Sequence, residues 1–101
     1  MITITHSPGC FKLEGHAGYA PHGQDIVCAS ISALTQVFIA SVEELTSDKL
    51  KCDIRPGNTV IEYGNLGEQA QVLLDSFLLG VKMISDSYPL YVRMESEVKN
   101  E

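Results

Sequence analysis

Residues 15–45 read GHAGYAPHGQDIVCASISALTQVFIASVEEL, a glycine-rich loop that leads into the most clearly periodic segment of the chain. Apolar side chains recur there at steps of three and four, which predicts an amphipathic helix over residues 26–45. The expected buried stripe of this helix is Val27, Ile31, Leu34, Phe38, Val42 and Leu45. Asp25 stands at the N-cap position, where its carboxylate can accept a hydrogen bond from the backbone N–H of Cys28.

The segments on either side of this helix follow strand and helix patterns in turn. Period-2 alternation predicts strands over residues 2–5, 11–14, 49–55 and 59–63, and a last strand that starts at Pro89 and turns Leu90, Val92 and Met94 to one face. A second helix is expected over residues 67–87, with an apolar stripe of Ala70, Leu73, Phe77, Val81 and Ile84. Turns at Pro8-Gly9 and Pro56-Gly57-Asn58 join the strands in pairs. The order ββαββαβ predicts an α/β (α+β) two-layer sandwich, in which two long helices cover one face of a mixed sheet. The polar tail, residues 96–101, is expected to fray.

Length and charge limit the classes of protein to which the chain can belong. A chain of 101 residues has room for a single domain, residues 1–101. The net charge is −6 and Lys and Arg form no cluster, which excludes binding to nucleic acid through a basic patch. We recognise no signal peptide and no apolar run of membrane-spanning length, so we expect no membrane span and a cytoplasmic location.

Cys28 falls in the first turn of the predicted helix. The thiolate is the nucleophilic form of cysteine, and a helix N-terminus or a nearby imidazolium stabilises it. Helical phase places Cys28 at the margin of the buried stripe, partly exposed, with Ser32 one turn below. The structural alternative is that Cys28 packs as a small apolar side chain, because cysteine is among the most buried residue types.

The other two cysteines carry no sign of activation. Cys52 alternates with charged residues in a strand pattern, which predicts that it packs on the inner face of a half-buried strand. Cys10 follows a turn and lies on the opposite parity from Phe11 and Leu13. The three cysteines lack CxxC spacing, so we expect neither a disulfide framework nor a zinc ribbon.

Two histidines of the flexible loop that precedes Cys28 could serve it as an acid/base. His16 closes the second strand, and the loop that follows can fold it onto Cys28, a pairing that suits acyl transfer such as peptide hydrolysis. Backbone N–H groups of the first helical turn and of the loop could form an oxyanion hole. His22, at the loop tip, is a competing base, whereas His6 is more distant in sequence. His16, His22 and Cys28 together match no common zinc spacing, so we expect neither a metal nor a cofactor.

Three short motifs resemble the ribosomal-processing cysteine protease family, often called Prp. They are Gly15-His16-Ala17-Gly18-Tyr19, then Gly23-Gln24-Asp25-Ile26-Val27-Cys28-Ala29, then Ser32-Ala33-Leu34. The resemblance implies a homodimeric cysteine endopeptidase that removes the N-terminal extension of a bacterial large-subunit ribosomal protein. It assigns Cys28 as nucleophile and His16 as general acid/base, with Asp25, Ser32 and Gly15 supporting the site.

The residues leave several roles open beside that resemblance. Asp25 either orients His16 or only caps the helix, and the Ser32 hydroxyl either serves the site or bonds the carbonyl one turn back. Gly18, Tyr19 and Gly23 are expected to belong to a mobile substrate-binding loop, because its glycines and polar character give it little to pack against. The alternative function is a non-enzymatic acidic binding or assembly module with a redox-sensitive thiol.

Overall fold

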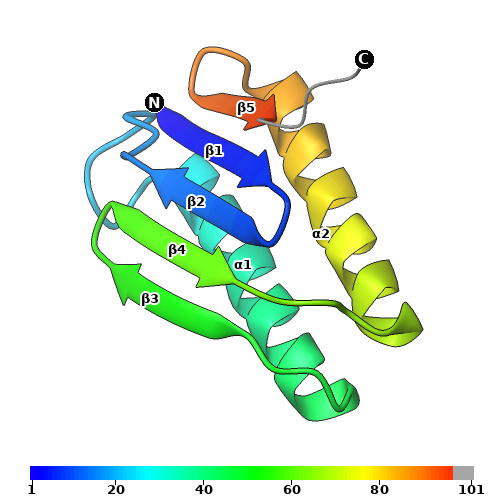
Figure 1. Ribbon diagram of the computed structural model, residues 1–101. Helices are drawn as coiled ribbons and strands as arrows, with labels where there is room; N and C mark the ends of the chain where they lie inside the picture. Colours follow the sequence, from blue (N-terminus) through cyan, green and yellow to red (C-terminus); the bar gives the residue numbers. More distant parts are fainter. Residues whose placement is uncertain (97–101) are drawn as a thin grey trace.

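A five-stranded mixed sheet with two helices on one face forms the fold, as the computed structural model of residues 1–96 shows (Figure 1). The elements in chain order are β1 (Ile2–Ser7), β2 (Cys10–Glu14), α1 (Ile26–Leu45), β3 (Lys51–Arg55), β4 (Asn58–Glu62), α2 (Glu68–Ser87) and β5 (Val92–Ser96). The predicted two-layer α+β architecture is therefore confirmed. The expected fraying was wrong at Ser96, which ends β5, and the rest of the predicted tail, residues 97–101, lies outside the described part of the chain.

The strands lie in the order β3-β4-β2-β1-β5, so the N-terminal hairpin occupies the middle of the sheet. The Pro8-Gly9 turn closes that hairpin, and Gly9 adopts a φ of 79°, a backbone conformation that favours glycine. β5 pairs with β1 in parallel, whereas the other pairs are antiparallel. A parallel pair needs a long crossover, and α2 supplies the one that precedes β5.

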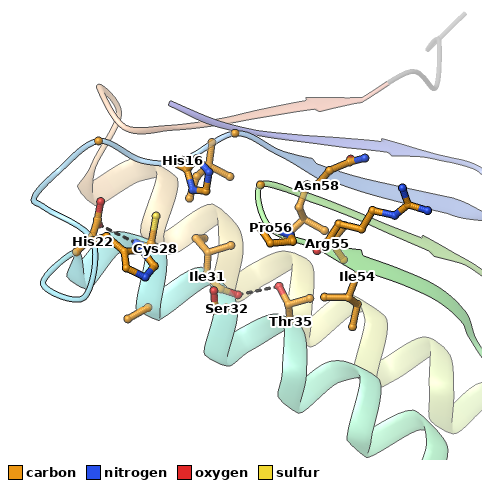
Figure 2. A pocket seen from close by; sticks show the side chains of 18 of the residues that line it. His16, His22, Cys28, Ile31, Ser32, Thr35, Ile54, Arg55, Pro56 and Asn58 are labelled. Carbon is orange, nitrogen blue, oxygen red and sulfur yellow. Dashed lines mark hydrogen bonds between the residues drawn. The ribbon is translucent and has the colours of Figure 1, made fainter.

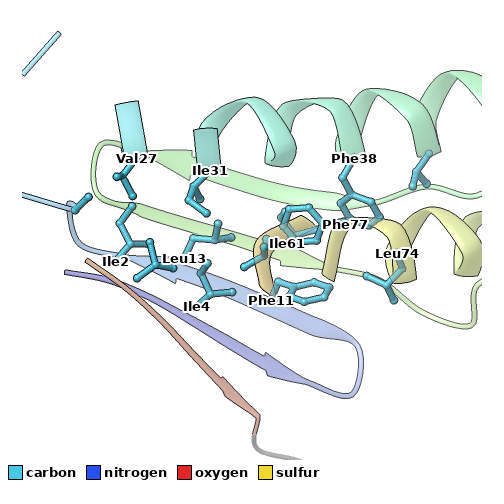
Figure 3. Close-up of a cluster of buried hydrophobic side chains, with 14 of the residues drawn as sticks. Ile2, Ile4, Phe11, Leu13, Val27, Ile31, Phe38, Ile61, Leu74 and Phe77 are labelled. Atoms are coloured by element: carbon cyan, nitrogen blue, oxygen red, sulfur yellow. The ribbon is translucent and has the colours of Figure 1, made fainter. Parts of the chain in front are cut away.

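The core lies between the sheet and the helices and is centred on Phe11 of β2 (Figure 3). The Phe11 ring meets the rings of Phe38 and Phe77 edge-on, at centroid distances of 6.4 and 5.4 Å. Phe38 of α1 and Phe77 of α2 stack on each other at 5.0 Å. Edge-to-face contacts of this kind add to the apolar burial, so one aromatic cluster holds both helices against the central hairpin.

The stripe of α1 differs from the prediction at three positions. Val27, Ile31, Phe38 and Val42 are buried as expected, but Thr35 is buried too. Its hydroxyl donates a hydrogen bond of 2.7 Å to the Ile31 carbonyl, which satisfies the buried polar group. Leu34 is only partly buried, and Leu45 is 70% exposed because it ends the helix, so the predicted burial of Leu45 was wrong.

By length and composition alone, α1 could cross a membrane, since it holds 20 residues with a mean hydropathy of 1.7. The expectation that the chain contains no apolar run of that length was therefore wrong. A core helix of a soluble protein passes the same test, and α1 turns one apolar stripe to the sheet, although only 28% of its apolar window is buried.

The exposure of the edge strand β3 and the start of β5 also differ from the predictions made from the sequence. All five residues of β3 are exposed, including Cys52, whose packing in the core was predicted. Cys52 pairs with buried Ile61 and so shares its inward face, but the helices leave this edge of the sheet uncovered. Leu90 is 78% exposed because Tyr88 to Tyr91 form a turn, and β5 starts only at Val92.

Candidate active site

A groove of about 1020 Å³ lies between α1, the loop of residues 15–25 and the β3–β4 turn (Figure 2). Three of its lining side chains are the ones that the sequence singled out, His16, His22 and Cys28. The groove therefore brings the predicted nucleophile and both candidate bases to one surface.

Cys28 lies in the first turn of α1 and is half-buried, as its helical phase predicted. The backbone N–H of Ala17 donates a hydrogen bond to the Cys28 sulfur over 3.3 Å. Ala17 is itself 3% exposed, so its methyl group anchors the start of the loop in the core. This N–H donor is held against the sulfur atom that would carry the nucleophilic electron pair.

Asp25 caps α1 and also holds the loop. One carboxylate oxygen accepts hydrogen bonds from the backbone N–H groups of Val27 and Cys28, over 3.0 and 2.9 Å. The other oxygen accepts the backbone N–H of Tyr19 over 3.0 Å, a contact for which the sequence gives no signal. These bonds, that from Cys28 foremost, lower the pKa of Asp25 below its usual 3.8. The predicted N-cap is confirmed, and the hydrogen bonds seen for Asp25 all run to backbone groups.

His16 follows β2 and lies exposed over the β3–β4 turn. The backbone N–H of Gly15 donates to the carbonyl of Gly57 over 2.8 Å, which brings the turn beside His16. Gly57 has a φ of 71°, and a Cβ at this position would come within 2.9 Å of His16 Nε2. The imidazole of His16 thus packs directly against Gly57, where the positive φ favours glycine and a Cβ would displace the ring.

Figure 2 shows His16 on the side of Cys28 that faces the β3–β4 turn, and His22 below the sulfur on the other side. Both histidines are exposed. Ser32 is exposed in the groove one turn along α1 from Cys28. Gly15 adopts a φ of 91°, and a Cβ there would collide with the Met1 carbonyl, so only glycine fits between β2 and His16.

The loop is better anchored than the sequence suggested. Tyr19 packs edge-on against Tyr88 and Tyr91, at centroid distances of 5.6 and 5.1 Å. Tyr88 ends α2 and Tyr91 precedes β5, so the contacts tie the loop to the far end of the chain. The expectation that the loop has little to pack against was wrong, because its one large aromatic ring finds two distant partners.

The first turn of α1 has fewer open donors than expected for an oxyanion hole. The N–H groups of Val27 and Cys28 are both bound by Asp25. The Ala17 N–H is likewise engaged, with the Cys28 sulfur, so it too is not an open donor for a substrate oxyanion.

His6 stands apart from this site and has a structural role. Its Nε2 shares a hydrogen bond of 3.1 Å with the Tyr63 hydroxyl, and its ring stacks on Phe11 at 4.3 Å. Burial lowers the pKa of His6 from its usual 6.5. Within residues 1–96, no three His, Cys, Asp or Glu side chains are grouped so that they could hold a metal ion.

A sequence model described as "Cysteine protease Prp" matches residues 1–93. The chain belongs to the Prp cysteine protease family. The Ribosomal processing cysteine protease Prp of Bacillus subtilis is 26% identical, over 96% of this chain and 95% of that protein. The protein of the same name from Mycoplasma genitalium is 30% identical, over 96% of this chain and 97% of its own length.

Solved structures share the fold of this Prp family member. A crystal structure from Streptococcus mutans is 28% identical, with a TM-score of 0.77 and coverage of 96% of both chains. Prp from Staphylococcus aureus, in complex with a covalently linked product peptide, has a TM-score of 0.92 and 24% identity over 96% of this chain and all of that one. The latter likeness shows the fold.

Membership of the Prp family makes this chain an enzyme, a cysteine protease of the ribosomal-processing class. The resemblance carried by the three motifs between Gly15 and Leu34 is thereby confirmed, and the alternative of a non-enzymatic binding module is wrong. The relatives are ribosomal processing proteases and the helices bury their apolar stripes against the sheet, so the chain is a soluble protein.

Proposed function

We propose that this Prp protease removes the N-terminal extension of a large-subunit ribosomal protein through Cys28 and His16. The observation that carries the proposal is the Cys28 sulfur, which lies in a capped first helical turn beside the Ala17 N–H and opens into the groove that His16 lines. A nucleophile, an acid/base and a hydrogen-bond donor on one groove are the parts that acyl transfer needs.

In the proposed reaction, the Cys28 thiolate attacks the carbonyl carbon of the scissile peptide bond. A C–S bond forms and the carbonyl electron pair moves onto oxygen; when that pair returns, the C–N bond breaks. The His16 imidazolium gives its proton to the departing amine. His16 then takes a proton from water as the water attacks the acyl-enzyme, the C–S bond breaks, and the thiolate is regenerated.

Asp25, Ser32 and Gly15 support these two residues in the proposal. The contacts of Asp25 favour a capping role that fixes the Cys28 backbone and the loop, over an orienting role toward His16. Gly15 lets the backbone before His16 pass close to the Met1 carbonyl, which fixes the place from which the His16 side chain extends. Ser32 lies on the groove wall, where its hydroxyl can bond the peptide backbone of the substrate.

The substrate is assigned from the relatives and from charge. Prp of Staphylococcus aureus has been solved with a substrate peptide and with a covalently linked product peptide. A net charge of −6 suits the approach of a basic ribosomal protein, whereas apolar parts of the groove set specificity. Gly18 and Gly23 line the groove and would contact the substrate on the loop side. Tyr19 does not line the groove, so in the proposal it positions the loop through its contacts with Tyr88 and Tyr91.

The proposal includes a cytoplasmic location and a homodimer, both taken from the family resemblance. The single chain has a mass of 11.0 kDa. Analytical ultracentrifugation at micromolar concentration is expected to give twice that mass, and the mass of one chain would remove the dimer from the proposal.

Cleavage of the purified, extended ribosomal protein tests the roles. Cys28→Ser is expected to bind the substrate without cleaving it, since a serine hydroxyl is a far weaker nucleophile in a site built for a thiolate. His16→Ala is expected to abolish turnover, whereas His22→Ala, the matched loop histidine, is expected to keep it. Cleavage by Cys28→Ser, or equal losses from the two histidine variants, would overturn the assignment.

A further inference from the structure

The groove does not end at Cys28 but continues along α1, away from the helix N-terminus. Its far part is lined by Thr35, Gln36 and Ile39 of α1 on one side and by Ile54 and Thr59 of the β3–β4 hairpin on the other. Figure 2 shows the Ile54 side chain near Thr35, beyond His16 and the turn. One continuous hollow therefore joins the catalytic residues to a second set of side chains.

Ile54 is unusual for an edge strand. The register pairs Ile54 with Thr59 and places it on the same face as buried Ile61, so it faces the helix layer, yet it is 63% exposed. Charged neighbours commonly protect an edge strand from pairing, and Lys51, Asp53 and Arg55 do so on the opposite face of β3. An exposed isoleucine on the inward face does not serve that purpose.

The spacing of residues along α1 gives the distance between this apolar part of the groove and Cys28, where the scissile bond would lie. At a rise of about 1.5 Å per residue, Thr35 and Ile39 lie about 10 and 16 Å beyond Cys28. An extended peptide advances about 3.3 Å per residue, so these spans correspond to about three and five residues.

We infer that Ile54 and Ile39 form an apolar specificity subsite, which takes an apolar substrate side chain three to five residues from the scissile bond. This inference rests on the proposed function, because continuity with the Cys28 groove makes the peptide substrate the occupant. An apolar side chain there would cover Ile54 and complete the burial of Ile39, which is already packed partly against the core.

The test is a peptide series based on the N-terminal extension of the ribosomal protein, in which one position at a time is changed to Ser on either side of the cleaved bond. Wild type is expected to lose about tenfold in kcat/KM at one position within the inferred span. Ile54→Thr keeps the β-branched shape and is expected to reduce that preference to less than threefold. Ile54→Asp is expected to favour a Lys at the same position.

The matched control is Val37→Thr, because Val37 is also 63% exposed but does not line the groove. This variant is expected to keep the positional preference of wild type. A positional preference that survives in Ile54→Thr overturns the inference. A change in the solution mass of Ile54→Thr without a change in its preference also overturns it, because Ile54 would then contact a second copy of the chain. The Kd of each peptide for Cys28→Ser measures the preference even if no cleavage is seen. A failure of the proposed cleavage reaction can therefore be told apart from a failure of the proposed subsite.

Discussion

The Asp25 carboxylate joins two segments that the chemistry needs together. It binds the N–H of Cys28 in the helix and the N–H of Tyr19 in the loop, so its charge holds both in place. Its folded pKa lies below the usual 3.8, so the stabilisation is complete above that pH and is lost as the pH falls through the folded pKa.

We therefore predict that the free energy of unfolding drops in acid below pH 3.8, in part because Asp25 is protonated. Asp25→Asn is expected to keep the helix cap and to remove this part of the pH dependence, while Asp25→Ala lowers stability across the pH range. Urea unfolding of the three proteins over a pH series measures the difference. An acid limb in Asp25→Asn as steep as that of wild type would contradict the prediction.

The exposed thiol and the groove thiol are expected to differ in reactivity. Burial of the sulfur and the charge of Glu43 raise the pKa of Cys52 above 9.0, which leaves little thiolate near neutral pH although its residue is exposed. Iodoacetamide near neutral pH is thus predicted to label Cys28 first, and Cys52 is expected to catch up as the pH rises above 9.0.

Peptide mass spectrometry after timed labelling measures both rates. Glu43→Gln removes the charge near Cys52 but keeps a side-chain acceptor for the Leu50 N–H, and it is expected to speed Cys52 labelling alone. Faster labelling of Cys52 than of Cys28 at neutral pH would refute the predicted order.

At the scale of elements, the loop of residues 15–25 depends on Tyr19. Each aromatic contact of Tyr19, with Tyr88 and with Tyr91, contributes about 0.5–1.5 kcal/mol to holding the loop in place. Tyr19→Ala is therefore predicted to lower kcat/KM for the extended ribosomal protein by roughly tenfold. Tyr19→Phe keeps the ring and is expected to behave as wild type.

Amide hydrogen exchange separates this loop effect from a general loss of stability. In Tyr19→Ala, exchange is expected to rise for residues 15–25 and to stay unchanged in β1 and β2. If residues 15–25 exchange in Tyr19→Ala at the same rate as in wild type, the tyrosine contacts do not hold the loop in place.

The elements also show how far periodicity predicts a fold. The bounds of α1 follow from its sequence, because a capping Asp25 and a regular stripe define where it begins and how it faces the sheet. Periodicity likewise places Cys52 and Ile54 on the inward face of β3. It cannot tell whether a helix covers that face, because coverage depends on which strand lies at the edge of the sheet.

For the whole molecule, the sequence singles out Cys28 and His16 as the candidate pair but not the contacts that hold them. The shared groove of Cys28 and His16 and the Asp25 cap could be predicted, because all three residues lie within one short stretch with a recognisable pattern. The packing of His16 on Gly57 and of Tyr19 on Tyr88 joins residues far apart in the chain. Such contacts follow from the pairing of β2 with β4 and from the path of α2, which no local pattern contains.

The stability of the whole molecule is predicted to depend on Phe11, which is fully buried where the sheet meets both helices. Phe11→Ala removes the ring that Phe38, Phe77 and His6 all contact, and it is expected to cost about 3–5 kcal/mol. That is a large part of the roughly 5–15 kcal/mol that holds a small domain folded. Leu79→Ala, at a residue 61% exposed on α2, is the control and is expected to change stability by less than about 0.5 kcal/mol. Urea unfolding measures both variants, and similar losses from the two would show that the aromatic cluster is not what holds the helices to the sheet.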